Sequence, residues 1–209
     1  MDEADFVERV QESNATELKR LGSEKALVAT TAASLDRETV LEQAAATQAR
    51  TVATLQQWAD NEPNDTASAA FATAAEQEQD HYDRICDLGA VEVTDPPADA
   101  LHTHLRDLDD TVERVGAGLV ARPLVASRTL LQVINFFVNE ADTTAADLFR
   151  EIRTETDEQV ETGASVLAGI CESDDWERAE RAAEEAVEVA YTEYADTLDR
   201  MGLDPKPVC

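Results

Sequence analysis

The sequence predicts an all-α protein, with a four-helix bundle at its centre and further helices at both ends of the chain. Apolar residues recur every three or four positions along most of the 209 residues, and no segment shows the period of two that a half-buried strand requires. Most of the seven glycines and six prolines stand where the helical pattern stops. The length suits one domain with attached helices, because a chain of this size buries a core without disulfide bonds.

The first part of the chain, residues 1–34, is expected to be a helical extension of the bundle. Residues 2–21 have the pattern of one helix, which ends where Gly22 can take the C′ position. Residues 23–33 then predict a second, short helix.

The first hairpin of the bundle comes next. A helix is predicted over residues 36–60, and the break NEPND follows it, with Asp65 as the N-cap of a helix over residues 66–88 that stops at Gly89. The inward stripe of the first of these helices is Leu41, Ala45, Gln48, Val52, Leu55 and Ala59.

The second hairpin follows a long connection. The segment VEVTDPPAD predicts a loop, and residues 98–115 predict a connecting helix that the letters GAG interrupt. Pro123 suits the first turn of a helix that reaches Asn139, and a further helix covers residues 143–170. Residues 36–171 together make up the predicted bundle.

The C-terminal segment, residues 174–201, predicts a last helix with Asp174 or Asp175 as its cap and Gly202 at its end. Its apolar stripe is Trp176, Ala183, Val187, Ala190, Tyr194, Leu198 and Met201. The stripe allows packing on the bundle or an intersubunit contact, and amphipathicity alone does not choose between them. Residues 202–209 are expected to form a loose tail.

The balance of charges excludes several classes of partner. The chain holds 17 Lys and Arg against 45 Asp and Glu, a net charge of −28, whereas nucleic acids and anionic membranes attract basic patches. No continuous apolar run reaches the roughly 18 residues of a membrane span, and the acidic N-terminus does not have the pattern of a signal peptide. Three scattered cysteines favour a reducing cytoplasm, with Cys86 and Cys171 as small core residues and Cys209 in the tail. We therefore expect a cytoplasmic protein that binds neither nucleic acid nor membrane.

The composition resembles that of proteins from halophilic archaea. Only three of the 17 basic residues are lysines, and the hydrophobic share of 43% is too high for a disordered acidic chain. So many like charges repel one another at low salt, whereas at molar salt the Debye length falls to about 3 Å and the repulsion is screened. The resemblance implies a high-salt cytoplasm as the solvent, and it carries no information about activity.

The two predicted hairpins repeat one another when the chain is shifted by 78 residues. The matched residues are Arg50-Thr51 with Arg128-Thr129, Asn61-Glu62 with Asn139-Glu140, Thr66-Ala67 with Thr144-Ala145, and Phe71 with Phe149. These identities indicate two copies of one αα-hairpin, although two alanine-rich hairpins also align passably by chance. Two hairpins joined by a long crossover close a bundle in the way that ferritin-like folds do.

The second helix of the bundle carries the one motif typical of a metal centre, Glu78 and His81. Because they stand three residues apart, they share a helix face. That face is otherwise apolar, with Ala67, Phe71, Ala74, Ile85 and Leu88. Two ionisable groups on a buried face are costly unless they pair or bind a metal. A metal site and a core histidine hydrogen-bonded to Glu78 or to the backbone therefore both remain open.

In the hairpin residues TQART and FATAAEQEQDHYDRI, the chain resembles rubrerythrins, which belong to the ferritin-like superfamily. The resemblance covers about residues 36–88, the repeat extends it to about residue 170, and both ends of the chain lie outside it. It implies a ferritin-like four-helix bundle with a di-iron site and peroxidase or ferroxidase chemistry. The chain lacks the cysteine pairs of the rubredoxin domain that many rubrerythrins carry.

Carried over residue by residue, the resemblance retains only two of six metal ligands. The family draws one Glu from each of the first and third helices, and Glu-x-x-His from each of the second and fourth. Glu78 and His81 match the second helix. The other positions fall on Ala45 or Ala46, Pro123 or Leu124, Thr156 and Gln159. Residues that a shifted register would offer are Gln48, Glu155 and Glu158. Two divalent ions need more carboxylates than this, so the resemblance implies a degenerate site.

Two further histidines, His102 and His104, occur in the connecting segment LHTHL. Two residues apart, they cannot share a helix face, and we expect them at the surface.

Three hypotheses for function follow. The first is a rubrerythrin-like, non-enzymatic protein with a structural or interaction role, which forms a homodimer and carries no cofactor. The second is an oxidoreductase of peroxidase or ferroxidase type that binds iron or another divalent metal through Glu78 and His81, with a small-molecule substrate that the sequence does not name. The third is an unrelated acidic bundle in which the Glu-x-x-His spacing is accidental. If the site is dry and metal-free, Glu78 and His81 should pair with each other, or with Gln159 or Thr156 across the core.

Overall fold

The computed structural model describes residues 1–172 and 174–206. These residues form helices without a single strand, which confirms the all-α prediction. The helices, in chain order, are α1 (Glu3–Ser13), α2 (Ala15–Leu21), α3 (Glu24–Thr30), α4 (Arg37–Asn61), α5 (Asp65–Gly89), α6 (Ala100–Arg106), α7 (Thr111–Val115), the π-helical segment η1 (Gly116–Ala121), α8 (Arg122–Asn139), α9 (Thr143–Ile170) and α10 (Asp175–Arg200).

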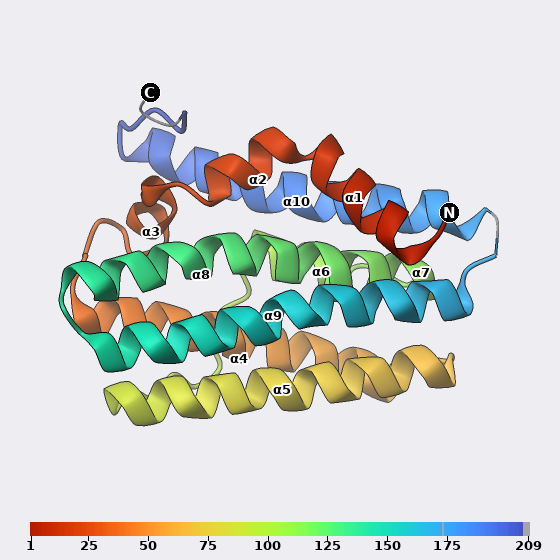
Figure 1. The fold of residues 1–209 in the computed structure, drawn as a ribbon, viewed down its shortest axis with the longest axis horizontal. Helices are drawn as coiled ribbons and strands as arrows, with labels where there is room; N and C mark the ends of the chain where they lie inside the picture. Colours follow the sequence, from red (N-terminus) through yellow and green to blue (C-terminus); the bar gives the residue numbers. More distant parts are fainter. Residues whose placement is uncertain (173, 207–209) are drawn as a thin grey trace.

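Four long helices form two antiparallel hairpins (Figure 1). Helix α4 packs along α5, α8 packs along α9, and α5 joins the two hairpins by its contact with α9. Helix α4 ends at Asn61 and α8 at Asn139, while α5 begins at Asp65 and α9 at Thr143. The two hairpins therefore turn at positions 78 residues apart, in the register that the sequence repeat predicts.

The N-terminus of α5 is capped one residue earlier than predicted. The side chain of Asn64, and not that of Asp65, accepts hydrogen bonds from the backbone N–H groups of Thr66 and Ala67, each 3.0 Å long. The extended backbone of Asn64 brings its amide oxygen over these two otherwise unpaired donors. Asp65 is instead the first helical residue, where a negative charge suits the helix dipole.

Replacing Asn64 with alanine should lower the free energy of unfolding by about 1 kcal/mol, because two N–H donors lose their acceptor. Asp65→Ala is the matched control and should cost only a few tenths of a kcal/mol, since molar salt screens its interaction with the helix dipole. Urea denaturation of both variants in molar KCl measures the difference. Equal losses would show that Asn64 is not the cap.

A continuous helical rod runs from Thr111 to Asn139, which corrects the predicted interruption at GAG. Helix α7 passes directly into η1, whose six residues are all buried, and η1 passes into α8. Pro123 therefore stands inside the rod, in the first turn of α8, and not at the start of a separate helix. Proline has no N–H and interrupts the i→i+4 hydrogen bonds of an α-helix. The i→i+5 hydrogen bonds of the π-helical segment before Pro123 let the rod continue past this interruption.

This rod has the length and the mean hydropathy of a membrane span, although no continuous apolar run within it reaches that length. Among the described residues it is the one helix that passes such a test, with a mean hydropathy of 1.2 over its most apolar window. That window is 78% buried inside the fold. A core helix passes the same test, so the result is weak evidence for a membrane.

The N-terminal helices and α10 form a layer against α8 and α9 (Figure 1). The rings of Phe6 in α1 and Trp176 in α10 lie 5.7 Å apart between their centroids. Both residues belong to one hydrophobic cluster that also contains Leu198 and the bundle residue Trp58. Of the two arrangements that its sequence allows, α10 therefore packs on the bundle of its own chain.

Residues 2–21 form two helices rather than the one predicted. The break lies at Asn14, whose side-chain amide donates a 2.8 Å hydrogen bond to the carbonyl of Val10. A buried asparagine that bonds to the preceding turn competes with continuation of the helix, and this local bond is the physical reason for the break.

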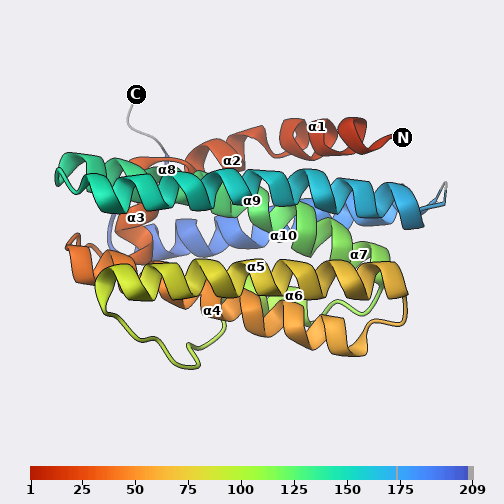
Figure 2. The ribbon, with the colours of Figure 1, turned by 60° about the horizontal axis from the view of Figure 1, so that its bottom comes forward.

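The connection between the hairpins contains two short helices in place of the single helix predicted over residues 98–115. Asp99 caps α6 and Asp110 caps α7, and a short turn separates them. The loop before α6 leaves the end of α5 (Figure 2) and is held to α4 by a 2.7 Å hydrogen bond from Arg50 Nε to the carbonyl of Pro97.

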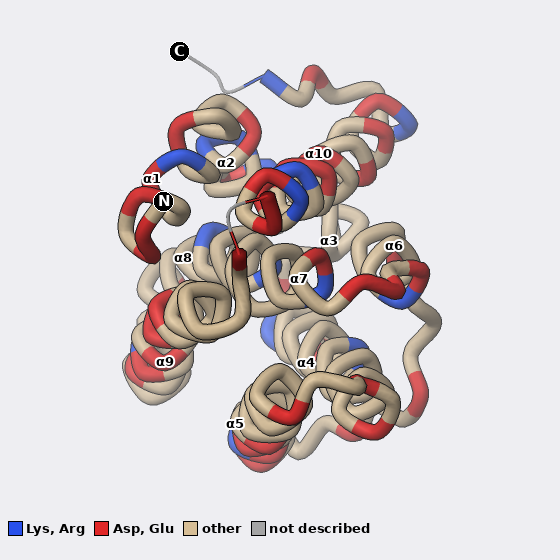
Figure 3. Tube along the Cα trace, turned by 90° about the vertical axis from the view of Figure 1, so that its right-hand side faces the viewer, with Lys and Arg blue, Asp and Glu red and all other residues tan. Residues whose placement is uncertain are grey.

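Acidic residues lie mainly on the outward sides of the helices (Figure 3), as expected for a chain of net charge −28. Cys86 and Cys171 are free and half-buried against the hydrophobic clusters, so the prediction of core cysteines holds only in part. The tail is less loose than predicted, because Lys25 Nζ donates to the carbonyls of Asp204 and Lys206. Cys209 and the rest of the tail beyond Lys206 lie outside the described residues.

Candidate functional site

Glu78 and His81 lie together on the face of α5 that points into the fold. Their exposed fractions are 1% and 0%, and His81 Nδ1 lies 3.4 Å from Glu78 Oε2. The spacing of three residues places them one turn apart on a face that otherwise holds Phe71, Ala74 and Ile85. The two side chains therefore lie within ion-pair distance of each other in buried surroundings, the arrangement expected for a dry, metal-free site.

The sequence analysis missed a third member of this site, Arg122, which is only 4% exposed. Arg122 Nη1 lies 2.9 Å from Glu78 Oε1, and Arg122 Nη2 donates a 2.6 Å hydrogen bond to Gln159 Oε1. A signal was available, because Arg122 is the only charged residue in the stretch VGAGLVARPLVAS. An arginine alone in an apolar stretch must find a buried partner or leave the core.

The π-helical segment η1 positions the guanidinium of Arg122. Within η1 the backbone N–H of Arg122 donates to the carbonyl of Ala117, five residues earlier. The next donor in that pattern would be Pro123, which has no N–H to give to the carbonyl of Gly118. Arg122 Nε donates to this carbonyl over 3.0 Å. The proline and the π-segment thereby fix one edge of the guanidinium and aim the other edge at Glu78.

These contacts keep Glu78 ionised. Burial raises the pKa of this carboxyl, but the charge of Arg122, together with the nearby polar groups of His81 and Gln159, outweighs burial and lowers the pKa of Glu78 from 4.5 to about 2. A buried cation of the protein itself therefore already balances this carboxylate.

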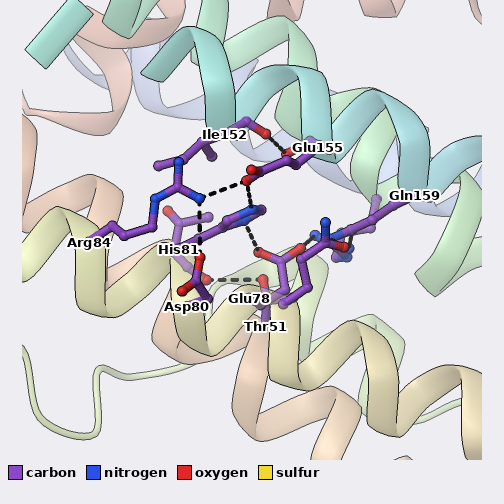
Figure 4. Close-up of polar contacts among 12 residues, drawn as sticks. Thr51, Glu78, Asp80, His81, Arg84, Ile152, Glu155 and Gln159 are labelled. Atoms are coloured by element: carbon purple, nitrogen blue, oxygen red, sulfur yellow. Dashed lines mark hydrogen bonds and ion pairs between the residues drawn. The ribbon is translucent and has the colours of Figure 1, made fainter. Parts of the chain in front are cut away.

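His81 connects the buried pair to the surface (Figure 4). His81 Nε2 lies 2.8 Å from Oε2 of Glu155 on α9, and Arg84 Nη1 donates to the same oxygen over 2.9 Å. The Glu155 side chain is 35% exposed. A row of polar contacts thus runs from Arg122 through Glu78, His81 and Glu155 to Arg84 at the edge of the fold. Glu155 is one of the three residues that the sequence analysis named as possible metal ligands under a shifted alignment with rubrerythrins.

This arrangement does not fit a di-iron site. The imidazole of His81 lies between two carboxylates, so Glu78 and Glu155 face different ring nitrogens and do not converge on one point as metal ligands must. Arg122 holds the remaining oxygen of Glu78. Within residues 1–172 and 174–206, no group of three or more His, Cys, Asp or Glu side chains is placed to hold a metal ion.

The remaining positions carried over from rubrerythrins are buried and carry no carboxylate. They are Ala45, Ala46, Pro123, Leu124, Thr156 and Gln159. The last two have side chains that bond within the protein, Thr156 Oγ1 to the carbonyl of Ile152 over 2.8 Å and Gln159 Nε2 to Gln77 Oε1 over 2.9 Å. Glu158, which a shifted register had offered, is exposed, whereas Gln48 is buried.

The surface location predicted for His102 is wrong. His102 is 2% exposed, with Nδ1 at 2.7 Å from Asp99 Oδ1 and Nε2 at 3.0 Å from Thr51 Oγ1. The cause is tertiary, because α6 packs against both α4 and α10 and these helices cover the histidine. His104, on another side of α6, is half-buried.

A cavity of about 340 Å³ opens beside Glu78 and Arg122, and residues of α3, α4, α8 and α10 line most of it. The site as a whole therefore combines a buried, internally balanced ion pair with space for a small molecule.

Comparison of the chain with protein-family models, with curated proteins and with solved structures finds no match.

Proposed function

We propose that this protein is a ferritin-like bundle of rubrerythrin type whose centre is an ion-pair network in place of a di-iron site, and that it has a structural or interaction role and not a redox one. One observation carries the proposal: Arg122 Nη1 lies 2.9 Å from Glu78 Oε1 in the core. A guanidinium at this distance neutralises the carboxylate and repels a divalent cation, strongly so where the surroundings are apolar.

The arrangement of the helices supports the ferritin-like part of the proposal. Two antiparallel hairpins, α4–α5 and α8–α9, are joined by the long connection from Ala90 to the rod that begins at Thr111. This order of short turns and one long crossover is one of the known ways to build a four-helix bundle. The hairpin residues that resemble rubrerythrins lie on α4 and α5.

A divalent-metal oxidoreductase that uses Glu78 and His81 is the second candidate. It is favoured by two buried atoms, Glu78 Oε1 and His81 Nδ1, that lack a hydrogen-bond partner within the described residues. A divalent cation at Glu78 Oε1 would be repelled by the guanidinium of Arg122 and would require it to move away, and this movement would leave the charge of Arg122 unpaired in the core. The first candidate is therefore preferred.

Metal analysis separates the two candidates. Protein produced in iron-supplemented medium and purified in molar KCl, without chelator or affinity tag, should contain far less than one equivalent of iron, manganese or zinc by mass spectrometry. The control is Glu78→Gln/His81→Gln, because an acidic surface also collects adventitious cations. The proposal requires the same metal content in both proteins. Two irons per chain that the double substitution removes would establish the oxidoreductase instead.

The homodimer and the high-salt cytoplasm expected from the sequence belong to the same proposal. The large hydrophobic residues exposed in the described part of the chain are Met1, Leu35, Val138 and Leu203. Light scattering during size-exclusion chromatography, in low and in molar KCl, measures both the mass of the assembly and its dependence on salt.

A further inference from the structure

The cavity beside Glu78 has the size of a small-molecule site. Its volume is about 340 Å³, whereas an apolar cavity of roughly 150 Å³ already admits benzene. Natural ligand pockets begin at about 300 Å³. The cavity lies where the two hairpins do not close on each other, since α4 and α8 make little direct contact. Seen along the helices, α4 lies on one side of the α7–α8 rod and α10 on the other (Figure 3).

Most of the cavity wall is apolar. Its larger aliphatic side chains include Leu27 of α3, Val40 of α4, Leu101 of α6, and Val125, Leu130 and Val133 of α8. Such a wall favours the hydrocarbon part of a ligand, because transfer of apolar surface out of water is favourable. Among the described residues no lysine lines the cavity, and Arg50 is engaged by Asp99 and by the carbonyl of Pro97.

The inner end of the cavity is polar and offers an acceptor. Glu78 and Arg122 both line it, and both are more than nine-tenths buried. Glu78 Oε1 contacts Arg122 as an ion pair, but no N–H or O–H of the described protein is aligned to hydrogen-bond to it. This oxygen has less than 1 Å² of accessible surface, so it accepts a hydrogen bond from a ligand once the Glu78 or Arg122 side chain shifts toward the cavity.

The charge at this end favours a neutral ligand. Glu78 and Arg122 balance each other, and Arg122 already uses two of its nitrogens for Gly118 and Gln159. A further buried charge would be desolvated beside a pair that has no spare counter-ion. Neutral polar side chains of the lining include Thr30, Gln43, Thr47 and Thr197. The carboxylates that line the cavity besides Glu78 are engaged, Asp99 by Arg50 and His102, and Glu193 by the N–H of Ala100.

We propose that this cavity binds a small, neutral, amphipathic organic molecule, with its hydrocarbon part against α3, α4 and α8 and a hydroxyl or N–H donor on Glu78 Oε1. The proposal rests on the interaction role proposed above and names the class of ligand for it. The ion-pair network is then the polar end of a ligand site.

A pair of isomers tests whether the ligand donates a hydrogen bond in the cavity. Dibutyl ether and 1-octanol have the same composition, but only the alcohol can donate a hydrogen bond. Calorimetric titration in molar KCl should show 1-octanol binding about tenfold or more tightly than dibutyl ether, because a hydrogen bond to an ionised acceptor is among the stronger ones. Octanoate and octylammonium should bind more weakly than the alcohol. Equal affinity for the two isomers, or tighter binding of either ion, would overturn the proposal.

Two substitutions on α8 test the location. Ala126→Phe fills the cavity that Ala126 lines and should abolish 1-octanol binding. Val138→Phe adds the same side chain at a site that is 50% exposed and should leave binding unchanged. If circular dichroism shows that Ala126→Phe is unfolded, Thr129→Phe replaces it, because Thr129 lines the same wall. Binding of 1-octanol that survives in a folded filled variant would refute the site. The titrations measure 1-octanol binding and the metal analysis measures bound metal. Failure of the ligand proposal can therefore be told apart from failure of the proposed function.

Discussion

Arg122→Met should lower the free energy of unfolding by about 3–5 kcal/mol, because it leaves the carboxylate of Glu78 buried without its counter-charge. Methionine retains much of the aliphatic volume of arginine, so the effect of packing is small by comparison. Gln159 Oε1 and the carbonyl of Gly118 also lose the hydrogen bonds that Arg122 donates to them. Urea denaturation at neutral pH in molar KCl measures the loss.

The loss should depend on pH in a definite direction. In the native protein the pKa of Glu78 is lowered to about 2, so its contribution to stability is present above the unfolded pKa and disappears as the pH falls from about 4.5 towards 2. In Arg122→Met, burial dominates and raises the pKa of Glu78, so acidification protonates the stranded carboxyl and relieves the cost. The difference in stability between the two proteins should therefore be largest at neutral pH and shrink towards pH 4.

Two controls identify the buried charge as the cause. Arg150→Met breaks the exposed pair with Asp147, whose side chains are 51% and 69% exposed, and should cost no more than about 0.5 kcal/mol. Adding Glu78→Gln to Arg122→Met removes the stranded charge and should restore much of the stability. If the double variant is no more stable than Arg122→Met, the ion pair is not what holds this part of the core.

Gly163→Ala should lower the free energy of unfolding by about 2–4 kcal/mol, although alanine is the better helix former. A Cβ at Gly163 would lie 2.3 Å from the carbonyl oxygen of Leu119 and 2.7 Å from its carbonyl carbon. Both atoms belong to the backbone of η1, which cannot yield as the end of a side chain can. The substitution should therefore push η1 away from α9 and disturb the Arg122 guanidinium that η1 positions.

Gly169→Ala is the matched control, on the same helix and six residues further along. A Cβ at Gly169 meets nothing within 4 Å, so alanine should raise the stability by about 0.5–1 kcal/mol through helix propensity alone. Thermal and urea denaturation of the two variants should give changes of opposite sign. Stabilisation by both would mean that α9 and η1 are less closely packed than the structure has them.

Much of the fold follows from local patterns that the sequence displays. Helix α9 has the predicted bounds, and α4 and α5 differ from theirs by one residue at each end. Apolar spacing and the turn residues determine these helices locally. The predicted helix bounds were wrong at Asn14, where the side chain bonds to the preceding turn and ends the helix. They were also wrong near Pro123, where the π-helical segment lets one helical rod continue.

The site divides in the same way. The spacing of three residues predicts that Glu78 and His81 share a helix face, and the apolar residues of that face predict its burial. Their partners depend on the tertiary structure, since Arg122 stands 44 residues after Glu78 and Glu155 stands 74 residues after His81. The close packing of η1 on α9, which requires Gly163, carries Arg122 to the oxygen of Glu78. A contact of this kind depends on how two distant helices approach, and no local pattern encodes that approach.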